Sequence, residues 1–158
     1  MTTANEIING VESWHDAKKL AIVTIGVSAS GKSTWANEMV NAGTGIIEIN
    51  RDAIRVELLH EKNGMQFSWK NWKWKWESEV TEIHRKKIES AAHDTNCHTV
   101  IISDTNLNKP HLDQLVVFLK EHNFNIEFKI FEVSYEEAVR RDAERHNGVG
   151  SHVIANIS

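Results

Sequence analysis

The feature that most constrains the fold is the segment GVSASGKS at residues 26–33, which matches the pattern G-x-x-x-x-G-K-[ST]. An apolar, β-branched run at 20–25 precedes this segment, and a helical pattern at 32–41 follows it. Small residues allow the backbone to curl so that successive amides point at phosphate oxygens, and the following helix contributes the positive end of its dipole. The combination of strand, loop and helix predicts a nucleotide-binding α/β domain.

The spacing within this loop assigns an expected role to each residue. The residues expected to contact nucleotide phosphates are Gly26, Ser28, Ala29, Ser30, Gly31, Lys32, Ser33 and Thr34. The positively charged Lys32 side chain would bind the β- and γ-phosphates, and the Ser33 hydroxyl is a candidate ligand for Mg²⁺. A nucleotide with its Mg²⁺ ion is therefore the expected ligand.

Strand and helix patterns alternate along the rest of the chain. Strands are expected at 20–25, 45–50, 99–103 and 126–133, and helices at 32–41, 51–60, 110–122 and 134–145. This alternation predicts an α/β fold, with a small parallel sheet of about four strands covered by helices on both faces. The length of 158 residues suits one domain. We expect an N-terminal extension at 1–19 and a phosphate-loop domain at 20–158.

Composition excludes several classes of protein. The chain has 18 basic and 22 acidic residues, and this net charge of −4 excludes a wholly basic nucleic-acid coat but not a local basic patch. A single cysteine, Cys97, excludes an internal disulfide and a cysteine zinc cluster. The longest aliphatic and aromatic run, 115–119, is too short to span a membrane, and 1–20 lacks an apolar signal core. We therefore expect a cytoplasmic protein without a membrane partner.

The phosphate loop alone is compatible with GTPases, motors and kinases. No N-K-x-D motif for guanine recognition is present, and large motors need a longer chain. A small phosphotransferase remains, and it needs a base for the acceptor hydroxyl and a group that holds the acceptor.

The sequence NRDAIR at 50–55 supplies candidates for both roles. It follows the strand expected at 45–50, and strand carboxyl ends in such sheets face the ligand crevice. Asp52 can accept a proton from a hydroxyl there, and Arg55, one helical turn later, can hold an anionic group of the same acceptor. An ordinary aspartate in a first helical turn, favoured by the helix dipole, explains Asp52 equally well at this point.

Four segments together resemble the 5′-kinase domain of bacteriophage end-healing polynucleotide kinase. They are GVSASGKSTWA, NRDAIR, VIISDTNLN and HNFNIEFKIFEVSYEEAVRRDAERH, and the resemblance covers roughly residues 20 to 155. It implies ATP- and Mg²⁺-dependent transfer of a phosphate to the 5′-hydroxyl of DNA or RNA during nucleic-acid repair. If the chain is phage-encoded, the expected location is the host cytoplasm.

The resemblance also implies roles for individual residues. Lys32 would bind the phosphates, Asp52 would be the general base, and Arg55 would hold the phosphate on the 3′ side of the reacting nucleotide. Asp104, at the end of the strand 99–103, resembles a Walker-B carboxylate or a residue that orients the acceptor.

A C-terminal lid is also implied, with Arg145 stabilising the transferred phosphoryl group and Arg141 on the same helical face. The segment after Arg145 has few basic residues, which leaves lid closure and a homo-oligomer open. The D-x-D-x-T motif of the family's phosphatase domain is absent from the sequence, so 3′-phosphatase activity is not expected.

A segment rich in tryptophan and lysine lies at 65–76, and it contains no acidic residue. One long helical pattern is carried by Trp69, Trp72, Trp76, Val80, Ile83 and Lys87. Its three tryptophans are expected in the core, whereas Trp74 falls off the stripe and is the best candidate for stacking on a base. The residues at 84–87 are expected to form a solvated helix face.

The function favoured by these observations is an ATP-dependent polynucleotide 5′-hydroxyl kinase. A small-molecule kinase of similar size and a non-catalytic nucleotide-binding module are the alternatives. Activity on free metabolites would favour the first alternative, and absence of turnover would favour the second. The preference for DNA or RNA, the preferred nucleotide donor and the oligomeric state stay open at this stage.

Overall fold

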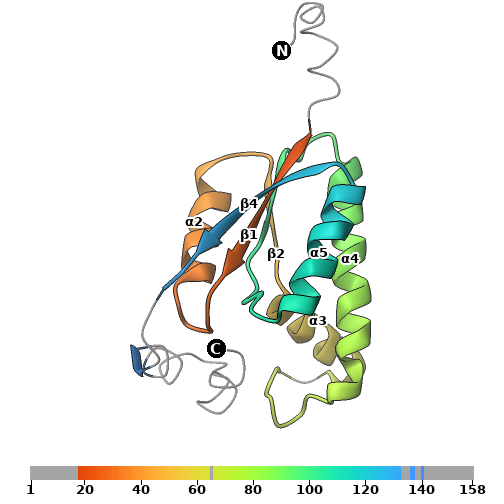
Figure 1. Ribbon diagram of the computed structural model, residues 1–158. Helices are drawn as coiled ribbons and strands as arrows, with labels where there is room; N and C mark the ends of the chain where they lie inside the picture. Colours follow the sequence, from red (N-terminus) through yellow and green to blue (C-terminus); the bar gives the residue numbers. More distant parts are fainter. Residues whose placement is uncertain (1–17, 65, 133–135, 138–139, 141–158) are drawn as a thin grey trace, which may run out of the picture.

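The fold is built around a sheet of four parallel strands, shown in a computed structural model that describes residues 18–64, 66–132, 136–137 and 140 (Figure 1). The strands are β1 (Lys19–Ile25), β2 (Ile46–Ile49), β3 (Thr99–Ile102) and β4 (Phe124–Ile130). Their order across the sheet is β2-β3-β1-β4, and every pairing is parallel. The predicted α/β fold with a four-stranded parallel sheet is confirmed.

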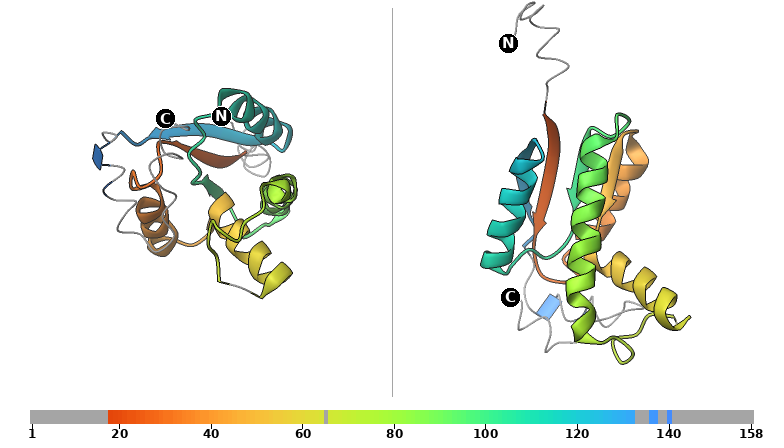
Figure 2. Two further views of the ribbon diagram at one scale, coloured as in Figure 1. Left: turned by 90° about the horizontal axis from the view of Figure 1, so that it is seen from below. Right: turned by 90° about the vertical axis from the view of Figure 1, so that its right-hand side faces the viewer.

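Helices cover both faces of this sheet (Figure 2). Helix α2 (Lys32–Ala42) lies on one face, and α4 (Glu77–His93) and α5 (Lys109–Glu121) lie on the other. Side chains of β1 alternate between these faces, with Ile22 packed in a cluster with Ala36 of α2. Ala21 and Val23 point to the opposite cluster, which includes Leu115 of α5. Both faces of the central strands are apolar because both are buried.

Helix α3 (Arg51–Asn63) begins directly after β2, at the end of the sheet where the phosphate loop also lies (Figure 1). The Asn50 side chain accepts a hydrogen bond from the Ala53 backbone amide and caps the helix, as its sequence position predicts. The inward face of α3 carries Ile54, Leu58 and Leu59, which pack with Val80 of α4 in a separate apolar cluster.

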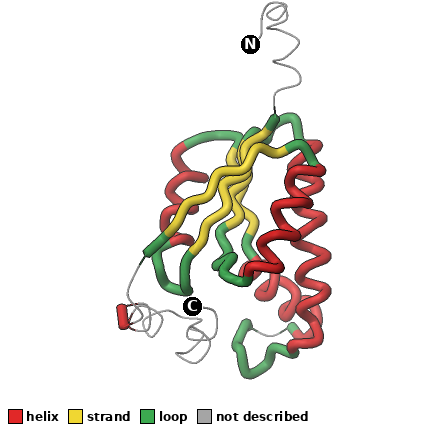
Figure 3. The backbone as a smooth tube through the Cα atoms, viewed as in Figure 1, coloured by secondary structure: helices red, strands yellow, loops and turns green. Residues whose placement is uncertain are grey.

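The expected long helix from Trp69 to Lys87 is wrong in its first part. Residues 66–73 form turns and loop, shown in green in Figure 3, a short 3₁₀ helix covers Trp74–Trp76, and α4 begins at Glu77. Trp72 is nevertheless buried, and Trp69 and Trp76 pack against the cluster formed with α3. The helical spacing therefore identified side chains that share one core, although the backbone that carries the first of them is not helical. A folded loop can also direct its side chains toward one apolar cluster.

Two further differences concern element boundaries and exposure. The strand expected at 126–133 begins two residues earlier, at Phe124, and ends at Ile130. His84 was expected on a solvated face, but it is only 2% exposed and lies on the stripe of α4 that faces the protein interior. The extension at 1–19 lies almost wholly outside the described residues, and the division of the chain into extension and domain stays a prediction.

Candidate active site

The phosphate loop links β1 to α2 with the curled backbone that its sequence predicts. Gly31 has φ of 104° and stands at the N-terminal cap of α2. A Cβ atom at Gly26 would lie 2.8 Å from the Phe131 carbonyl oxygen, so that position needs glycine. Lys32 is 6% exposed, and its Nζ donates to the Val27 carbonyl at 2.6 Å. The loop thus holds a charged ammonium group at the first turn of a helix.

The remaining loop residues surround this lysine. Ser30 is buried, and its hydroxyl lies 3.2 Å from Lys32 Nζ, while Ser28 is half-buried. Ser33 and Thr34 are exposed in the first turn of α2, where a hydroxyl can reach a bound ligand. The residues therefore fit a nucleotide phosphate chain and an accompanying cation.

Ala29 stands in the left-handed region, with φ of 65°, which is unfavourable for a residue with a Cβ atom. We expect Ala29→Gly to raise the free energy of unfolding by about 0.5–1 kcal/mol, because relief of this strain outweighs the added entropy of the unfolded chain. Ala36→Gly, inside α2, should lower the same quantity by about 1 kcal/mol or more. Urea unfolding measures the free energy of unfolding of both variants. A lower value for Ala29→Gly than for wild type would contradict the inferred backbone strain at Ala29.

The segment 103–108, SDTNLN, connects the parts of the site through its polar groups. Asn50 donates to the Ser103 carbonyl and hydroxyl oxygens, at 3.2 and 3.1 Å. The Thr105 carbonyl accepts from the Gly26 amide at 3.0 Å, and the Asn106 side chain donates to the Thr24 carbonyl at 2.7 Å. The end of β3 therefore fixes both the phosphate loop and the start of α3.

Asp104 lies at the centre of these connections. Its Oδ1 accepts from the Arg51 amide at 2.7 Å, and its Oδ2 lies 2.9 Å from His84 Nε2. Burial raises the pKa of this carboxyl, but hydrogen bonds and charges from His84 and Arg51 outweigh burial and hold the pKa below its usual range. Both carboxylate oxygens are engaged, so Asp104 is suited to orienting its neighbours.

Asp52 and Arg55 meet as their spacing predicts. Arg55 Nη1 lies 2.5 Å from Asp52 Oδ1. The Asp52 side chain is 52% exposed and the Arg55 side chain only 14%, so the carboxylate is open to solvent while the guanidinium is held inside. The pair lies on the first turns of α3, at the carboxyl end of β2.

Glu77 holds the other side of the Arg55 guanidinium. Its carboxylate accepts from Arg55 Nε at 2.8 Å and Nη2 at 3.0 Å. It also accepts from Arg51 Nη2 at 3.2 Å and from the Trp72 indole at 2.8 Å. This bidentate geometry fixes the plane of the guanidinium. Burial raises the pKa of Glu77, but hydrogen bonds and charges from the two arginines lower it below the usual value.

The lowered pKa of Glu77 gives an expected pH dependence of stability. Its ionised form contributes stability above the ordinary value near 4.5, and this contribution is lost as pH falls through the lower folded-state pKa. At neutral pH, Glu77→Gln should therefore lower the free energy of unfolding by about 2 kcal/mol, as for hydrogen bonds to charged groups. The difference from wild type should shrink at acidic pH. Denaturant titrations across this range measure it.

Glu82→Gln on the same helix is the matched control. Its carboxylate is 64% exposed and lies 4.0 Å from Lys86, so the substitution should change stability by less than about 0.5 kcal/mol. If Glu77→Gln lowered the free energy of unfolding by the same amount at neutral and at acidic pH, the charge on Glu77 would not stabilise the fold.

Sequence reasoning missed Glu77 and His84. Glu77 is the first acidic residue after the lysine-rich stretch at 65–76, which is a signal for a partner to nearby cations. His84 lies four residues after Val80 and four before Ile88, so it interrupts an otherwise apolar stripe. A polar residue on a buried stripe needs a partner, and Asp104 supplies it.

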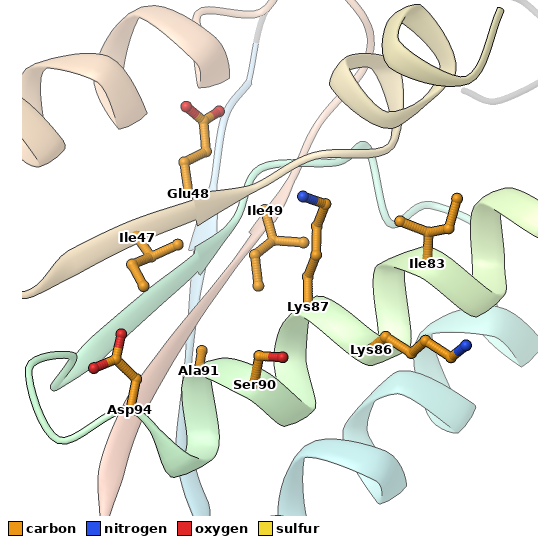
Figure 4. A pocket seen from close by; sticks show the side chains of 9 residues that line it. All are labelled: Ile47, Glu48, Ile49, Ile83, Lys86, Lys87, Ser90, Ala91 and Asp94. Atoms are coloured by element: carbon orange, nitrogen blue, oxygen red, sulfur yellow. The ribbon is translucent and has the colours of Figure 1, made fainter. Parts of the chain in front are cut away.

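Of the other predicted site residues, one lies at the surface beside this centre and two lie outside the described part. Trp74 is exposed on the 3₁₀ helix, and Arg141 and Arg145 lie outside the described residues. An open groove between β2 and α4 is lined by Ile47, Lys87 and Asp94, among others (Figure 4). None of the residues predicted for the active site lines this groove.

Two features are absent from the part of the chain that the structure describes. In that part, no three His, Cys, Asp or Glu side chains are grouped so as to hold a metal ion. No helix there combines the length and the apolar character needed to cross a bilayer.

Comparison with known proteins places this geometry in a family. The sequence model of the family described as "AAA domain" matches residues 22–157 of this chain. The chain belongs to this family. The match begins in β1 and includes the phosphate loop, so the nucleotide-binding fold inferred from GVSASGKS is confirmed.

A curated relative agrees with the predicted resemblance to polynucleotide kinases. A "Putative bifunctional polynucleotide kinase/RNA ligase" of Autographa californica nuclear polyhedrosis virus is 31% identical over 135 residues. The match covers 82% of this chain but 18% of the relative, so this chain spans less than a fifth of that protein.

Two solved structures share the fold. In the Pnkp1/Rnl/Hen1 RNA repair complex, the matching chain is 22% identical with a TM-score of 0.70, over 89% of this chain and 43% of that one. A gluconokinase from Sinorhizobium meliloti 1021 is 19% identical with a TM-score of 0.52, over 89% of this chain and 73% of the gluconokinase chain. A kinase-type phosphate-loop fold is thus established.

Proposed function

We propose that this protein is an ATP-dependent polynucleotide 5′-hydroxyl kinase, with DNA or RNA ends as acceptors. The observation that carries the proposal is the Asp52–Arg55 pair, joined at 2.5 Å in the first turns of α3. This helix begins at the same end of the sheet as the phosphate loop (Figure 1). An accessible base beside an anion-binding arginine suits an acceptor that has a hydroxyl and a nearby phosphate. The viral relative supports this choice among kinases.

In the proposed reaction, the 5′ oxygen of the acceptor attacks the γ-phosphorus of ATP. The bond between that phosphorus and the bridging oxygen breaks, ADP leaves, and the hydroxyl proton passes to the Asp52 carboxylate. Lys32 and the N-terminus of α2 stabilise negative charge on the phosphates. Asp52 suits the base better than Asp104, because both oxygens of Asp104 are already engaged.

Arg55 has donors left for the acceptor. Of its five N–H groups, the bonds to Glu77 and Asp52 use three, and two are not engaged by any described residue. These donors would bind the phosphate on the 3′ side of the reacting nucleotide. Because Glu77 fixes the guanidinium plane, the remaining donors have a defined direction.

Ser33 would hold Mg²⁺, which neutralises charge on the β- and γ-phosphates when it is bound. Its exposed hydroxyl in the first turn of α2 fits this role. We keep Arg145 as the proposed lid residue over the transferred phosphoryl group, with Arg141 as its neighbour. We also keep residues 20–158 as the proposed kinase domain.

Transfer of labelled γ-phosphate to a panel of acceptors tests the proposal. The panel contains 5′-hydroxyl DNA and RNA oligonucleotides, nucleoside 3′-monophosphates, plain nucleosides and sugar acids. We expect labelling of oligonucleotides and of nucleoside 3′-monophosphates. Labelling confined to nucleosides or sugar acids would establish a small-molecule kinase, and ATP binding without any transfer would establish a binding module.

A further inference from the structure

A stacked pair of tryptophans, one exposed and one half-buried, lies next to the proposed acceptor site. Trp74 is 62% exposed, and its ring stacks on Trp69 with centroids 5.4 Å apart and an interplanar angle of 20°. The Arg55 guanidinium carbon in turn lies 5.4 Å from the Trp69 ring centroid. The two rings therefore form a continuous path from the proposed acceptor arginine to the protein surface.

The loop beneath this pair is well supported. Phe67 is buried and meets Trp69 edge to face, with centroids 5.2 Å apart. Backbone hydrogen bonds from Asn71 to Ser68 and from Trp72 to Trp69 close its turns, at 2.9 and 3.3 Å. The exposed Trp74 ring thus stands on a fixed base, and much of its surface is left out of the core.

The surroundings of the pair are positively charged. Lys70, Lys73 and Lys75 are exposed, and the sequence 65–76 has no acidic residue. Glu77, the next acid, is bound by two arginines and one indole. The exposed Trp74 ring among lysines suits a single-stranded nucleic acid, since rings stack on bases and lysines attract phosphates. An apolar protein partner would not need this charge.

We propose that Trp74 and Trp69 form a subsite on which a base of the acceptor strand stacks, beyond the phosphate that Arg55 holds. The inference rests on the proposed kinase function. A strand whose reacting 5′ end lies at Asp52 and whose first phosphate lies on Arg55 extends from there in its 3′ direction, and the Trp69 ring next to that arginine is within its reach. The ligand is single-stranded nucleic acid with at least one nucleotide beyond the reacting one.

Steady-state kinetics on two acceptors test the subsite. Thymidine 3′-monophosphate has no further base, whereas a short 5′-hydroxyl oligothymidylate has several. Trp74→Ala should lower kcat/KM on the oligonucleotide by roughly 5- to 100-fold more than on the mononucleotide, the effect expected for one stacked base. Trp74→Tyr, which keeps a ring, should recover most of this difference, whereas Trp74→Leu should not.

Phe128→Ala is the matched control, because Phe128 is also an aromatic residue with half of its surface exposed, on β4. It should not change the ratio between the two acceptors. An equal effect of Trp74→Ala on both acceptors would overturn the subsite while leaving the kinase function in place.

Binding without turnover separates this inference from the proposed function. Fluorescence anisotropy of labelled oligothymidylate and oligouridylate, without ATP, should show weaker binding to Trp74→Ala than to wild type.

Replacing Lys70, Lys73 and Lys75 by alanine should reduce the slope of log affinity against log salt by up to about 2, at roughly 0.7 per phosphate contact. Trp74-dependent binding in a protein that transfers no phosphate would refute the kinase and keep the subsite. Binding that is indifferent to Trp74 would refute the subsite.

Discussion

Asp52→Asn should lower kcat of phosphate transfer by about 10²–10⁴-fold, the usual contribution of a general base. Asparagine keeps the size of the side chain and can still accept a hydrogen bond from Arg55, but it cannot take the hydroxyl proton. ATP affinity should stay near that of wild type, because Lys32 and the loop backbone are unchanged. Single-turnover transfer and equilibrium ATP binding measure the two quantities.

Asp113→Asn is the control for this change. Asp113 is 61% exposed and paired with Lys109 at 3.0 Å, so it resembles Asp52 in exposure and in having a helical cation as partner. Its loss should leave kcat unchanged. If Asp52→Asn weakened ATP binding instead of turnover, Asp52 would be a ligand of the nucleotide or its metal rather than the base.

Local sequence was sufficient to predict the phosphate loop and the Asp52–Arg55 pair. Both depend on residues that are close in the chain, within one loop or one helical turn, so spacing alone brings them together. The four-stranded parallel sheet was predictable for a similar reason, since alternating strands and helices allow few other arrangements. The buried TVII strand is the clearest example, because its apolar run fits a central position.

Contacts between distant segments were not predictable in the same way. Glu77 reaches Arg55 across 22 positions, and His84 reaches Asp104 across 20, and neither pairing leaves a periodic signal. The loop at 66–73 has helical spacing because its rings share one apolar cluster, and burial rather than backbone geometry produced the pattern. The resemblance supplied Asp104 but not the histidine that fixes it.

Arg55→Ala should remove the distinction between acceptors with and without a 3′-phosphate. The reacting hydroxyl is neutral, so the nearest fixed charge on a nucleic-acid acceptor is that phosphate. Wild type should therefore use a nucleoside 3′-monophosphate much better than the nucleoside. The variant should lose about 2–5 kcal/mol of this preference, the range for removing one partner of a buried charge pair. The ratio of kcat/KM for the two acceptors measures it.

Loss of Arg55 also affects folding, and the assay must separate the two effects. Arg55 is 14% exposed and bonds Glu77 through two nitrogens, so the variant should be less stable and is assayed below its unfolding transition. Arg85→Ala is the control, because Arg85 is a half-buried arginine whose guanidinium carbon lies 5.2 Å from the Phe118 ring. It should leave the acceptor ratio unchanged.

Arg55→Lys gives the sharpest test, because it keeps the positive charge and removes the planar set of guanidinium N–H donors. A lysine ammonium cannot bond both oxygens of Glu77 in one plane while it also meets Asp52 and an acceptor phosphate. If charge alone selects the acceptor, Arg55→Lys should keep most of the preference for the 3′-phosphate. If orientation by Glu77 matters, as the bidentate geometry indicates, Arg55→Lys should resemble Arg55→Ala. Equal use of both acceptors by wild type would remove Arg55 from acceptor binding and favour a small-molecule acceptor.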